Sequence, residues 1–272
     1  MSGIRAPGER PAELWVTRLG LTDYDEALSL QHRLRRARVA AAIPDVLLLL
    51  EHPPVYTRGR RSEAAELPRG GDWYRNRGVA LRDVDRGGKT TYHGPGQLVG
   101  YPILDTIVVD RDVSRLVRSI ERALIAALAG EGVAARRDAA GRGVWAGGGK
   151  TAGKIGSIGL HVSHGVTTHG FAVNVDCDLT PFSWIKPCGL DDPATSIATQ
   201  TGRAGGMRCF SRRAAFELAR SLGLRQRLVS RARLLAELNA AAASPVLGGT
   251  SVPPAEPPAQ PVHASDDLVF SP

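Results

Sequence analysis

Residues 46–50 read V-L-L-L-L, the longest strongly apolar run in the chain, and this run predicts a strand at the centre of the fold. A continuous apolar stretch of this length is typical of a strand buried on both faces. The stretch before it, residues 23–42, predicts a helix that Asp23 caps and Pro44 terminates. The segment E-H-P-P-V-Y-T-R-G that follows at 51–59 is rich in turn formers and predicts a loop.

The rest of the chain shows short apolar stretches scattered among a few helical patterns. Further strands are expected at 79–84, 98–104, 155–162 and 171–175, and further helices at 114–130, 212–222 and 231–243. The strands do not alternate regularly with helices, so the pattern predicts an α+β fold. Residues 244–272 contain seven prolines and few large apolar side chains, which predicts a disordered Pro-rich tail.

Composition places the chain among ordinary globular proteins, with 272 residues, 43% hydrophobic and 23% charged. The V-L-L-L-L run is far shorter than the ~20 residues that cross a bilayer, so no membrane association is expected. The N-terminal residues offer no apolar stretch of the kind found in secretion signals. Three cysteines are too few for a disulfide framework or a paired-cysteine metal site. We therefore expect a cytoplasmic protein with reduced thiols.

The formal charge of +8 comes largely from residues 201–243, which hold nine arginines against two glutamates. Nucleic-acid-binding proteins usually place aromatic residues among such charges, and this stretch has only Phe210 and Phe216. The pattern favours a solvated helix face, with an electrostatic dock for an acidic partner as the alternative. No nucleic acid is expected as a partner.

Three segments concentrate residues suited to chemistry. Residues 86–101, R-G-G-K-T-T-Y-H-G-P-G-Q-L-V-G-Y, combine polar side chains with glycines that let a ligand approach the backbone. Residues 150–159, K-T-A-G-K-I-G-S-I-G, bring lysines out of a glycine-rich loop into a strand. Residues 181–190, P-F-S-W-I-K-P-C-G-L, place Cys188 between Pro187 and Gly189.

Several sharper interpretations of these segments fail on spacing. Neither Lys89 nor Lys150 has the upstream glycine of a P-loop, and Ser157 lacks that of a serine-hydrolase turn. The remaining chemically interesting side chains have ordinary explanations. We expect His161, His164 and His169 to be hydrogen-bonded or to lie at the surface. We expect Cys177 and Cys209 to be inert small hydrophobes. The interpretation best supported by these segments is a reactive thiol, Cys188, that a nearby cation, Lys154, activates.

The segment from Arg86 resembles the signature of the octanoyltransferases of lipoate biosynthesis. Four further segments resemble the same family in the same order, and the likeness covers roughly residues 12–222. They are E-H-P-P-V-Y-T-R-G from Glu51, G-K-I-G-S-I-G from Gly153, T-T-H-G-F-A-V-N-V from Thr167 and P-F-S-W-I-K-P-C-G-L from Pro181. The glycine-rich stretch 146–149 and the tail have no counterpart in the family.

The resemblance implies a mixed sheet flanked by helices, similar to the catalytic domains of biotin and lipoate protein ligases. It implies that Cys188 is the acyl-thioester nucleophile and Lys154 the general acid and base. The family places its lysine directly before an I-x-x-I-G strand, which selects Lys154 over Lys150. It also implies an acyl pocket lined by Arg86, Gly87, Gly88, Lys89, Thr90, Thr91, Tyr92, His93, Ser157, Ile158, Gly159, Gly170, Phe171 and Ala172.

The activity implied is transfer of an octanoyl group from octanoyl-acyl carrier protein to a lysine of lipoyl domains. The acceptors would be the lipoyl domains of 2-oxoacid dehydrogenases and the glycine cleavage H protein, and no cofactor or metal is expected. Two alternatives stay open: an ATP-dependent lipoate or biotin protein ligase of the same fold, and a non-catalytic basic binding protein. The expected domain organisation is a catalytic domain at 1–222, a C-terminal helical segment at 223–243 and the tail at 244–272.

Overall fold

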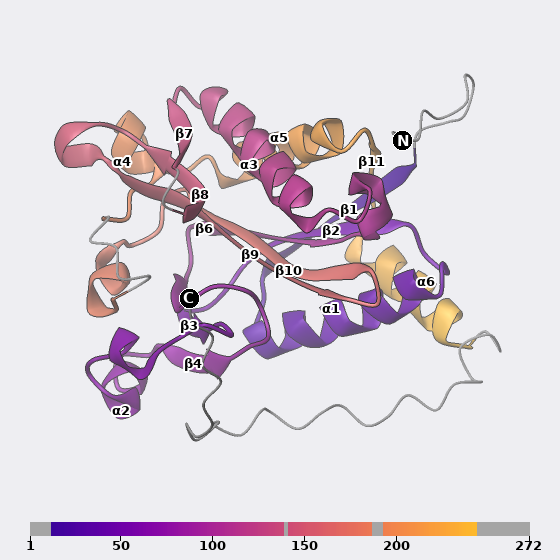
Figure 1. Ribbon diagram of the computed structural model, residues 1–272, viewed down its shortest axis with the longest axis horizontal. Coiled ribbons are helices and arrows are strands. Elements are labelled where there is room, and N and C mark those ends of the chain that lie inside the picture. Colours follow the sequence, from indigo (N-terminus) through magenta and orange to yellow (C-terminus); the bar gives the residue numbers. More distant parts are fainter. Residues whose placement is uncertain (1–11, 139–140, 187–192, 244–272) are drawn as a thin grey trace, which may run out of the picture.

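The computed structural model describes residues 12–138, 141–186 and 193–243, which form an eight-stranded mixed sheet covered by helices on both faces (Figure 1). In spatial order the strands are β11 (Arg225–Leu228), β1 (Glu13–Leu21), β2 (Asp45–Glu51), β6 (Gln97–Ile103), β10 (Val166–Asn174), β9 (Gly153–Ser163), β8 (Gly141–Ala146) and β7 (Ala135–Asp138). The first three of these strands run parallel to one another, and every later pairing is antiparallel. The predicted α+β class is confirmed.

Helices α3 (Val113–Ala129) and α5 (Met207–Ser221) cover one face of the sheet, which we call the α3/α5 face. Helices α1 (Tyr24–Val39) and α6 (Arg231–Ala243) cover the opposite α1/α6 face. Two further helices, α2 (Gly71–Arg75) and α4 (Ile197–Thr201), are short. Single 3-10 turns occur at Ala64–Glu66, Thr106–Val109, Gly149–Thr151 and Thr180–Trp184. The described part of the chain contains no helix both long and apolar enough to cross a membrane.

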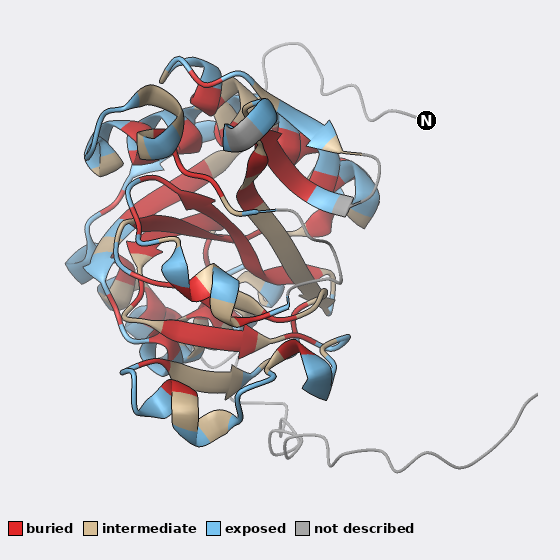
Figure 2. Ribbon diagram, turned by 90° about the vertical axis from the view of Figure 1, so that its left-hand side faces the viewer, coloured by how far each residue is buried: buried red, intermediate tan, exposed pale blue. Residues whose placement is uncertain are grey.

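Strand β2 explains why the V-L-L-L-L run is apolar throughout. Its side chains alternate between the faces, so Leu47 and Leu49 pack with α3 and α5 while Leu48 and Leu50 pack with α1 and α6. Each of these leucines is at most 2% exposed, and the central strands are buried along most of their length (Figure 2). The predicted buried strand is confirmed, and so is the N-cap at Asp23, whose carboxylate accepts from the N–H groups of Asp25 and Glu26.

A smaller sheet, in the order β4 (Ala80–Asp83), β3 (Val55–Arg58) and β5 (Thr91–His93), lies at one end of the molecule. Tyr56 and Tyr92 of this sheet form a separate core with Tyr74 of α2 and Ile185. Two tyrosine hydroxyls donate to carbonyl oxygens of the next segment: Tyr56 to Pro181 at 2.6 Å and Tyr74 to Trp184 at 3.0 Å. The segment that precedes residue 187 is therefore attached to the small sheet.

The loop predicted at 51–59 is wrong at Val55–Arg58, which forms strand β3, whereas residues 52–54 and Gly59 lie outside the strands. Val55–Arg58 is the central strand of the small sheet and pairs with β4 on one side and β5 on the other. Pro53 and Pro54 precede the strand and do not interrupt its hydrogen bonds. The predicted helix at 212–222 begins earlier, at Met207, and the one at 23–42 ends at Val39. Strands β1, β5, β7, β8 and β11 were not predicted. The tail expected at 244–272 lies outside the described residues.

Candidate active site

Lys154 stands near the start of β9, directly opposite Trp145 of β8. Its ammonium nitrogen Nζ lies 4.8 Å from the centre of the Trp145 ring, within the range of a cation–π contact. The aliphatic part of the side chain passes Gly143, where an added Cβ would be 2.9 Å from Cε of Lys154. Glycine at 143 therefore leaves the space that the lysine occupies.

The backbone of Lys154 is also fixed from its other side, by residues that follow the Cys188 segment. Its N–H donates to the carbonyl oxygen of Pro193 at 2.8 Å, and its carbonyl accepts from the N–H of Thr195 at 3.1 Å. These bonds form a short parallel bridge between Lys154 and Ala194. The described segment that begins at Pro193 therefore pairs directly with the lysine backbone. Cys188 itself lies outside the described residues.

The strand register sorts the expected pocket residues between the two faces of the sheet. Ser157 stands opposite Ala172, and Gly159 opposite Gly170. Because cross-strand partners share a face and Ala172 packs in the α1/α6 core, all four belong to that face. Ser157 also stands opposite Gly143, so Gly143 belongs to this face too. Because an added Cβ on Gly143 would meet the Lys154 side chain, that side chain lies on the same face.

Two of the expected pocket residues face the other way. Phe171 is buried in the α3/α5 core, and Ile158, its cross-strand partner, packs against that core. The Phe171 ring lies over Gly100 of β6, where an added Cβ would be 2.2 Å from a ring carbon. The side chains of Phe171 and Ile158 therefore point away from the face that carries Lys154.

The glycine-rich segment from Arg86 crosses the α1/α6 face, and its backbone lies in direct contact with β9. The N–H of Gly87 donates to the carbonyl oxygen of Leu160 at 3.0 Å. A Cβ on Gly159 would lie 2.8 Å from the carbonyl oxygen of Gly87, and one on Gly59 would lie 2.5 Å from that of Gly88. Glycine is thus required where two backbones meet.

Arg86 secures this segment to the small sheet. Its guanidinium is buried and donates to Thr57 three times: Nη2 to the carbonyl oxygen at 2.6 Å, and Nη2 and Nε to the hydroxyl at 2.8 and 3.1 Å. Asp85, the preceding residue, accepts from Nε2 of His169 on β10 at 2.6 Å. The segment is consequently held from β3 and from β10 at once.

The Asp85–His169 contact is a hydrogen bond whose donor, Nε2 of His169, belongs to a buried side chain. Burial lowers the pKa of His169, and the neighbouring Asp85 only partly opposes this effect. The hydrogen bond from His169 holds the pKa of Asp85 well below its usual range. His161 lies 3.5 Å from the same carboxylate, whereas His164 is exposed. These positions confirm the hydrogen-bonded or surface roles expected for the three histidines.

The second half of the glycine-rich motif belongs to the small sheet and its surroundings. Lys89 forms an ion pair with Glu63 at 2.7 Å, and the Thr90 N–H donates to Glu66 at 2.8 Å. Thr91 and Tyr92 stand in β5, where the Tyr92 ring packs against Tyr56 and Phe182. These four expected pocket residues are therefore also engaged in structural contacts.

His93 closes the motif as a buried, neutral imidazole whose pKa burial lowers to about 3. Its Nδ1 lies 2.7 Å from Oε1 of Gln97. The amide nitrogen of Gln97 already donates to the Tyr92 carbonyl and to Asn174, so Oε1 is the acceptor. His93 is therefore protonated on Nδ1.

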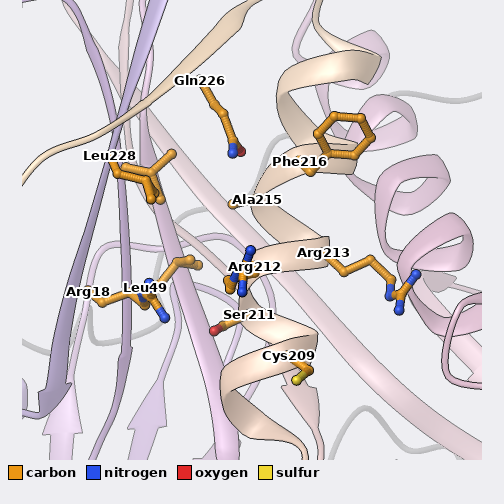
Figure 3. Close-up of a pocket in the computed structure, with 11 residues that line it drawn as sticks. Arg18, Leu49, Cys209, Ser211, Arg212, Arg213, Ala215, Phe216, Gln226 and Leu228 are labelled. Carbon is orange, nitrogen blue, oxygen red and sulfur yellow. The ribbon is translucent and has the colours of Figure 1, made fainter.

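A groove of about 440 Å³ opens on the other side of the sheet, between α5 and strands β1, β2 and β11 (Figure 3). Val16, Leu49 and Ala215 line it and belong to the α3/α5 core, so it does not share a face with Lys154. Cys209 also lines this groove and is exposed, whereas the inert small-hydrophobe role expected for it implies burial. Arg212 and Phe216 complete its rim.

Cys177 fits the inert role predicted for it. The side chain is buried, and burial raises the pKa of its thiol to about 12. Among the residues that the structure describes, no group of three or more His, Cys, Asp or Glu side chains could hold a metal ion.

Several residues that support the site were assigned no role from the sequence, although Thr57 lies in the family-like segment at 51–59. Thr57 lies 29 positions from Arg86, and its role depends on the unpredicted strand β3. Gly143 and Trp145 lie in β8, which was also unpredicted. Their only sequence signal is a glycine two residues before a tryptophan, upstream of the K-I-G-S-I-G stretch.

Comparisons with known proteins show the family to which this fold belongs. Residues 23–219 match the family model described as the lipoyl protein ligase A/B catalytic domain. An octanoyltransferase of Mycolicibacterium smegmatis is 48% identical over 206 residues, which are 75% of this chain and 85% of that protein. One from Rubrobacter xylanophilus is 48% identical over 199 residues, 72% of this chain and 87% of the relative.

Among solved structures, a bipartite lipoate protein ligase of Thermoplasma acidophilum, described with its E2 lipoyl domain, has a TM-score of 0.62 at 15% identity. The match covers 85% of this chain and 91% of the ligase, and it shows a shared fold. The chain belongs to the lipoyl protein ligase A/B catalytic-domain family, and within that family to the octanoyltransferases. The family predicted from the motifs is thereby confirmed, as is the likeness of the fold to lipoate protein ligases.

Proposed function

We propose that this chain transfers an octanoyl group from octanoyl-acyl carrier protein to a lysine of lipoyl domains. The relatives named octanoyltransferase, at 48% identity over most of their length, support the reaction. The observation that carries the proposal in this chain is the position of Lys154, on the face of the sheet that the Arg86–Gly88 segment crosses.

Cys188 is proposed as the nucleophile that carries the acyl group, and the chain path supports its partnership with Lys154. The N–H of Lys186 donates to the backbone carbonyl oxygen of Glu66 at 3.0 Å, and the carbonyl oxygen of Pro193 accepts from the N–H of Lys154 at 2.8 Å. Cys188 is five residues from Pro193, and an extended chain of that length spans at most roughly 18 Å. Covalent geometry therefore limits how far Cys188 can lie from Pro193, which contacts the Lys154 backbone, and this limit is compatible with the proposed partnership.

The proposed reaction has two steps. First, the Cys188 thiolate attacks the carbonyl carbon of the donor thioester, and the pantetheine thiolate that leaves takes a proton from Lys154. Second, the lipoyl-domain amine attacks the enzyme thioester, Lys154 accepts the proton that the amine loses, and the Cys188 thiolate leaves. The first step exchanges one thioester for another and the second makes an amide, so neither requires ATP.

The acyl chain is proposed to lie on the α1/α6 face of the sheet, between Lys154 and the Arg86–Gly88 segment. Backbone N–H groups of the glycine-rich stretches are the donors proposed for the developing oxyanion. Ser157, Gly159, Gly170 and Ala172 share this face, which supports their place in the pocket.

The proposed acceptors are the lipoyl domains of 2-oxoacid dehydrogenases and the glycine cleavage H protein. The solved ligase of the same fold is described together with its own E2 lipoyl domain, which supports a lipoyl-domain acceptor as a class. We place the reaction in the cytoplasm, where exposed free thiols such as Cys209 stay reduced.

An ATP-dependent ligase of the same fold is the second candidate, because lipoate protein ligases share this architecture. A single experiment separates the two. The chain is incubated with an apo lipoyl domain and either octanoyl-acyl carrier protein alone or octanoic acid with ATP and Mg²⁺. We expect modification of the lipoyl domain by mass spectrometry only with the acyl carrier protein. Modification only with octanoic acid and ATP would assign the ligase, and none under either condition would favour a binding protein.

A further inference from the structure

Two buried amide side chains join the glycine-rich motif to the backbone around Lys154. Gln97 begins β6 and Asn174 ends β10, and the two residues are direct cross-strand partners. Gln97 is 1% exposed and Asn174 5% exposed. Neither belongs to the expected pocket, and neither is a residue to which the proposed reaction gives a role.

Every hydrogen bond in this connection has a defined direction. His93 donates from Nδ1 to Oε1 of Gln97, and Nε2 of Gln97 donates to Oδ1 of Asn174 at 2.9 Å. Nδ2 of Asn174 then donates to the carbonyl oxygen of Thr195, also at 2.9 Å. Thr195 in turn donates its own N–H to the carbonyl of Lys154. A continuous chain of four hydrogen bonds therefore runs from His93 to Lys154.

The Pro193–Thr195 segment depends on this connection because it is held between two partners. On one side it pairs with the Lys154 backbone, and on the other its Thr195 carbonyl accepts from Asn174. Thr195 is buried, so a carbonyl without its donor would lose a hydrogen bond that water cannot replace. The segment would then shift, and the lysine backbone that pairs with it would shift too.

We propose that Asn174 and Gln97 are positioning residues that align Lys154 with the glycine-rich motif. This inference rests on the proposed role of Lys154 in proton transfer. A catalytic group displaced by about 1 Å can lose about 100-fold in rate, so the alignment affects turnover more than binding.

Asn174→Asp tests the inference because it keeps the shape of the side chain and replaces its donor with a carboxylate oxygen. The ionised carboxylate would face the Thr195 carbonyl, acceptor against acceptor. A protonated carboxyl can donate to that carbonyl, and burial raises the pKa of the introduced group. His93, the nearest titratable neighbour in the network, has a pKa of about 3 and stays neutral between pH 6 and 8.

We expect Asn174→Asp to lower kcat about 10- to 100-fold at pH 8, with KM for octanoyl-acyl carrier protein unchanged within twofold. Relative to the unchanged protein at each pH, the deficit should shrink as the pH falls to 6. Asn174→Ala should show a similar deficit at both values. If Asn174→Asp does not fold, Gln97→Met provides the same test of kcat against KM, with a smaller loss because Asn174 still contacts Thr195.

Asp45→Asn is the matched control for lost stability. Asp45 is a buried residue at the start of β2, beside the end of β6 that lies farthest from Gln97. Its carboxylate accepts from Arg38 at 2.7 Å and from the Asp105 N–H at 3.0 Å. The inference is overturned if Asn174 variants lose no more kcat than Asp45→Asn at the same fall in Tm. It is also overturned if the loss lies in KM, or if the Asn174→Asp deficit does not change with pH.

Lys154→Ala, measured in parallel, separates this inference from the proposed function. Full activity in Lys154→Ala would reject the proposed role of the lysine. A large loss in Lys154→Ala together with control-like Asn174 variants would reject only the positioning role.

Discussion

Gly143 and Lys154 lie so close across neighbouring strands that a single methyl group on Gly143 would meet the lysine side chain. The added Cβ would lie 2.9 Å from Cε of Lys154 and 2.5 Å from the carbonyl oxygen of Gly156. Gly143 also has a φ of +138°, a backbone conformation that residues with a side chain rarely adopt. Space and backbone conformation both require glycine at this position.

Gly143→Ala should therefore reduce activity by displacing Lys154, and it should cost about 1–3 kcal/mol of unfolding free energy. We expect at least a tenfold fall in kcat, measured with octanoyl-acyl carrier protein and a lipoyl domain. Gly132→Ala is the control, because Gly132 also has a positive φ but an added Cβ there meets nothing within 4 Å. Equal losses of activity in the two variants would contradict this account of Lys154.

Lys154→Ala should suppress acylation of the enzyme and transfer to the lipoyl domain, while Lys150→Ala should be much milder. Loss of general acid–base catalysis typically lowers a rate about 10²- to 10⁴-fold. Lys154 stands in β9 beside Trp145, whereas Lys150 belongs to the short turn Gly149–Thr151. Single-turnover rates of both steps give the comparison, and small, equal effects would mean that the wrong lysine was chosen.

Acidification should destabilise the fold through its buried histidines. Burial lowers the pKa of His93 to about 3 and also lowers those of His52 and His169, whereas an unfolded histidine titrates near 6.5. Below that value the unfolded chain binds more protons than the folded one, so stability falls as the pH falls. His93 alone should account for a loss of about 2 kcal/mol between pH 7 and pH 5.

His93→Asn retains a donor that can reach Gln97 and removes the titration, so its stability should fall less over that pH interval. Urea unfolding at pH 7 and pH 5 measures the difference. His164→Asn is the control, since His164 is exposed, and its pH dependence should match that of the unchanged protein. An unaltered pH dependence in His93→Asn would show that His93 is not buried in its neutral form.

The two described cysteines should differ sharply in reactivity. In a Cys188→Ser background at pH 7.5, iodoacetamide should modify Cys209, which is exposed. Cys177 should react only after unfolding, because it is buried and its thiol has a pKa of about 12. Peptide mapping identifies the modified residue, and comparable rates at both cysteines in the folded protein would count against the core packing of Cys177.

Strands β2, β6 and β10 could be predicted from the sequence because they are buried along all or nearly all of their length. The apolar run of β2 and the amphipathic pattern of α3 reflect packing on two faces and on one face, respectively. Strand β3 escaped prediction because prolines precede it and its pairing partners, β4 and β5, come from later in the chain. Edge strand β11, with the sequence R-Q-R-L, has no apolar pattern at all.

The site was predictable only where glycines and motifs mark it. The pairs Ser157–Ala172 and Gly159–Gly170 meet on one face because two predicted strands happen to be neighbours in antiparallel register. The supporting roles of Thr57, Gly143 and Asn174 could not be predicted, although Thr57 and Asn174 lie in family-like segments, since all three act through partners distant in sequence. Short-range patterns carry no information about such contacts.

The central claim is that Cys188 carries the acyl group while Lys154 moves the protons. Its most direct test is intact-mass analysis of the chain after mixing with octanoyl-acyl carrier protein in the absence of ATP. We expect the mass of one octanoyl group to be added, to be removed by hydroxylamine, and to map to Cys188 by peptide analysis. An adduct on Cys177 or Cys209, or one that forms only with ATP, would contradict the account.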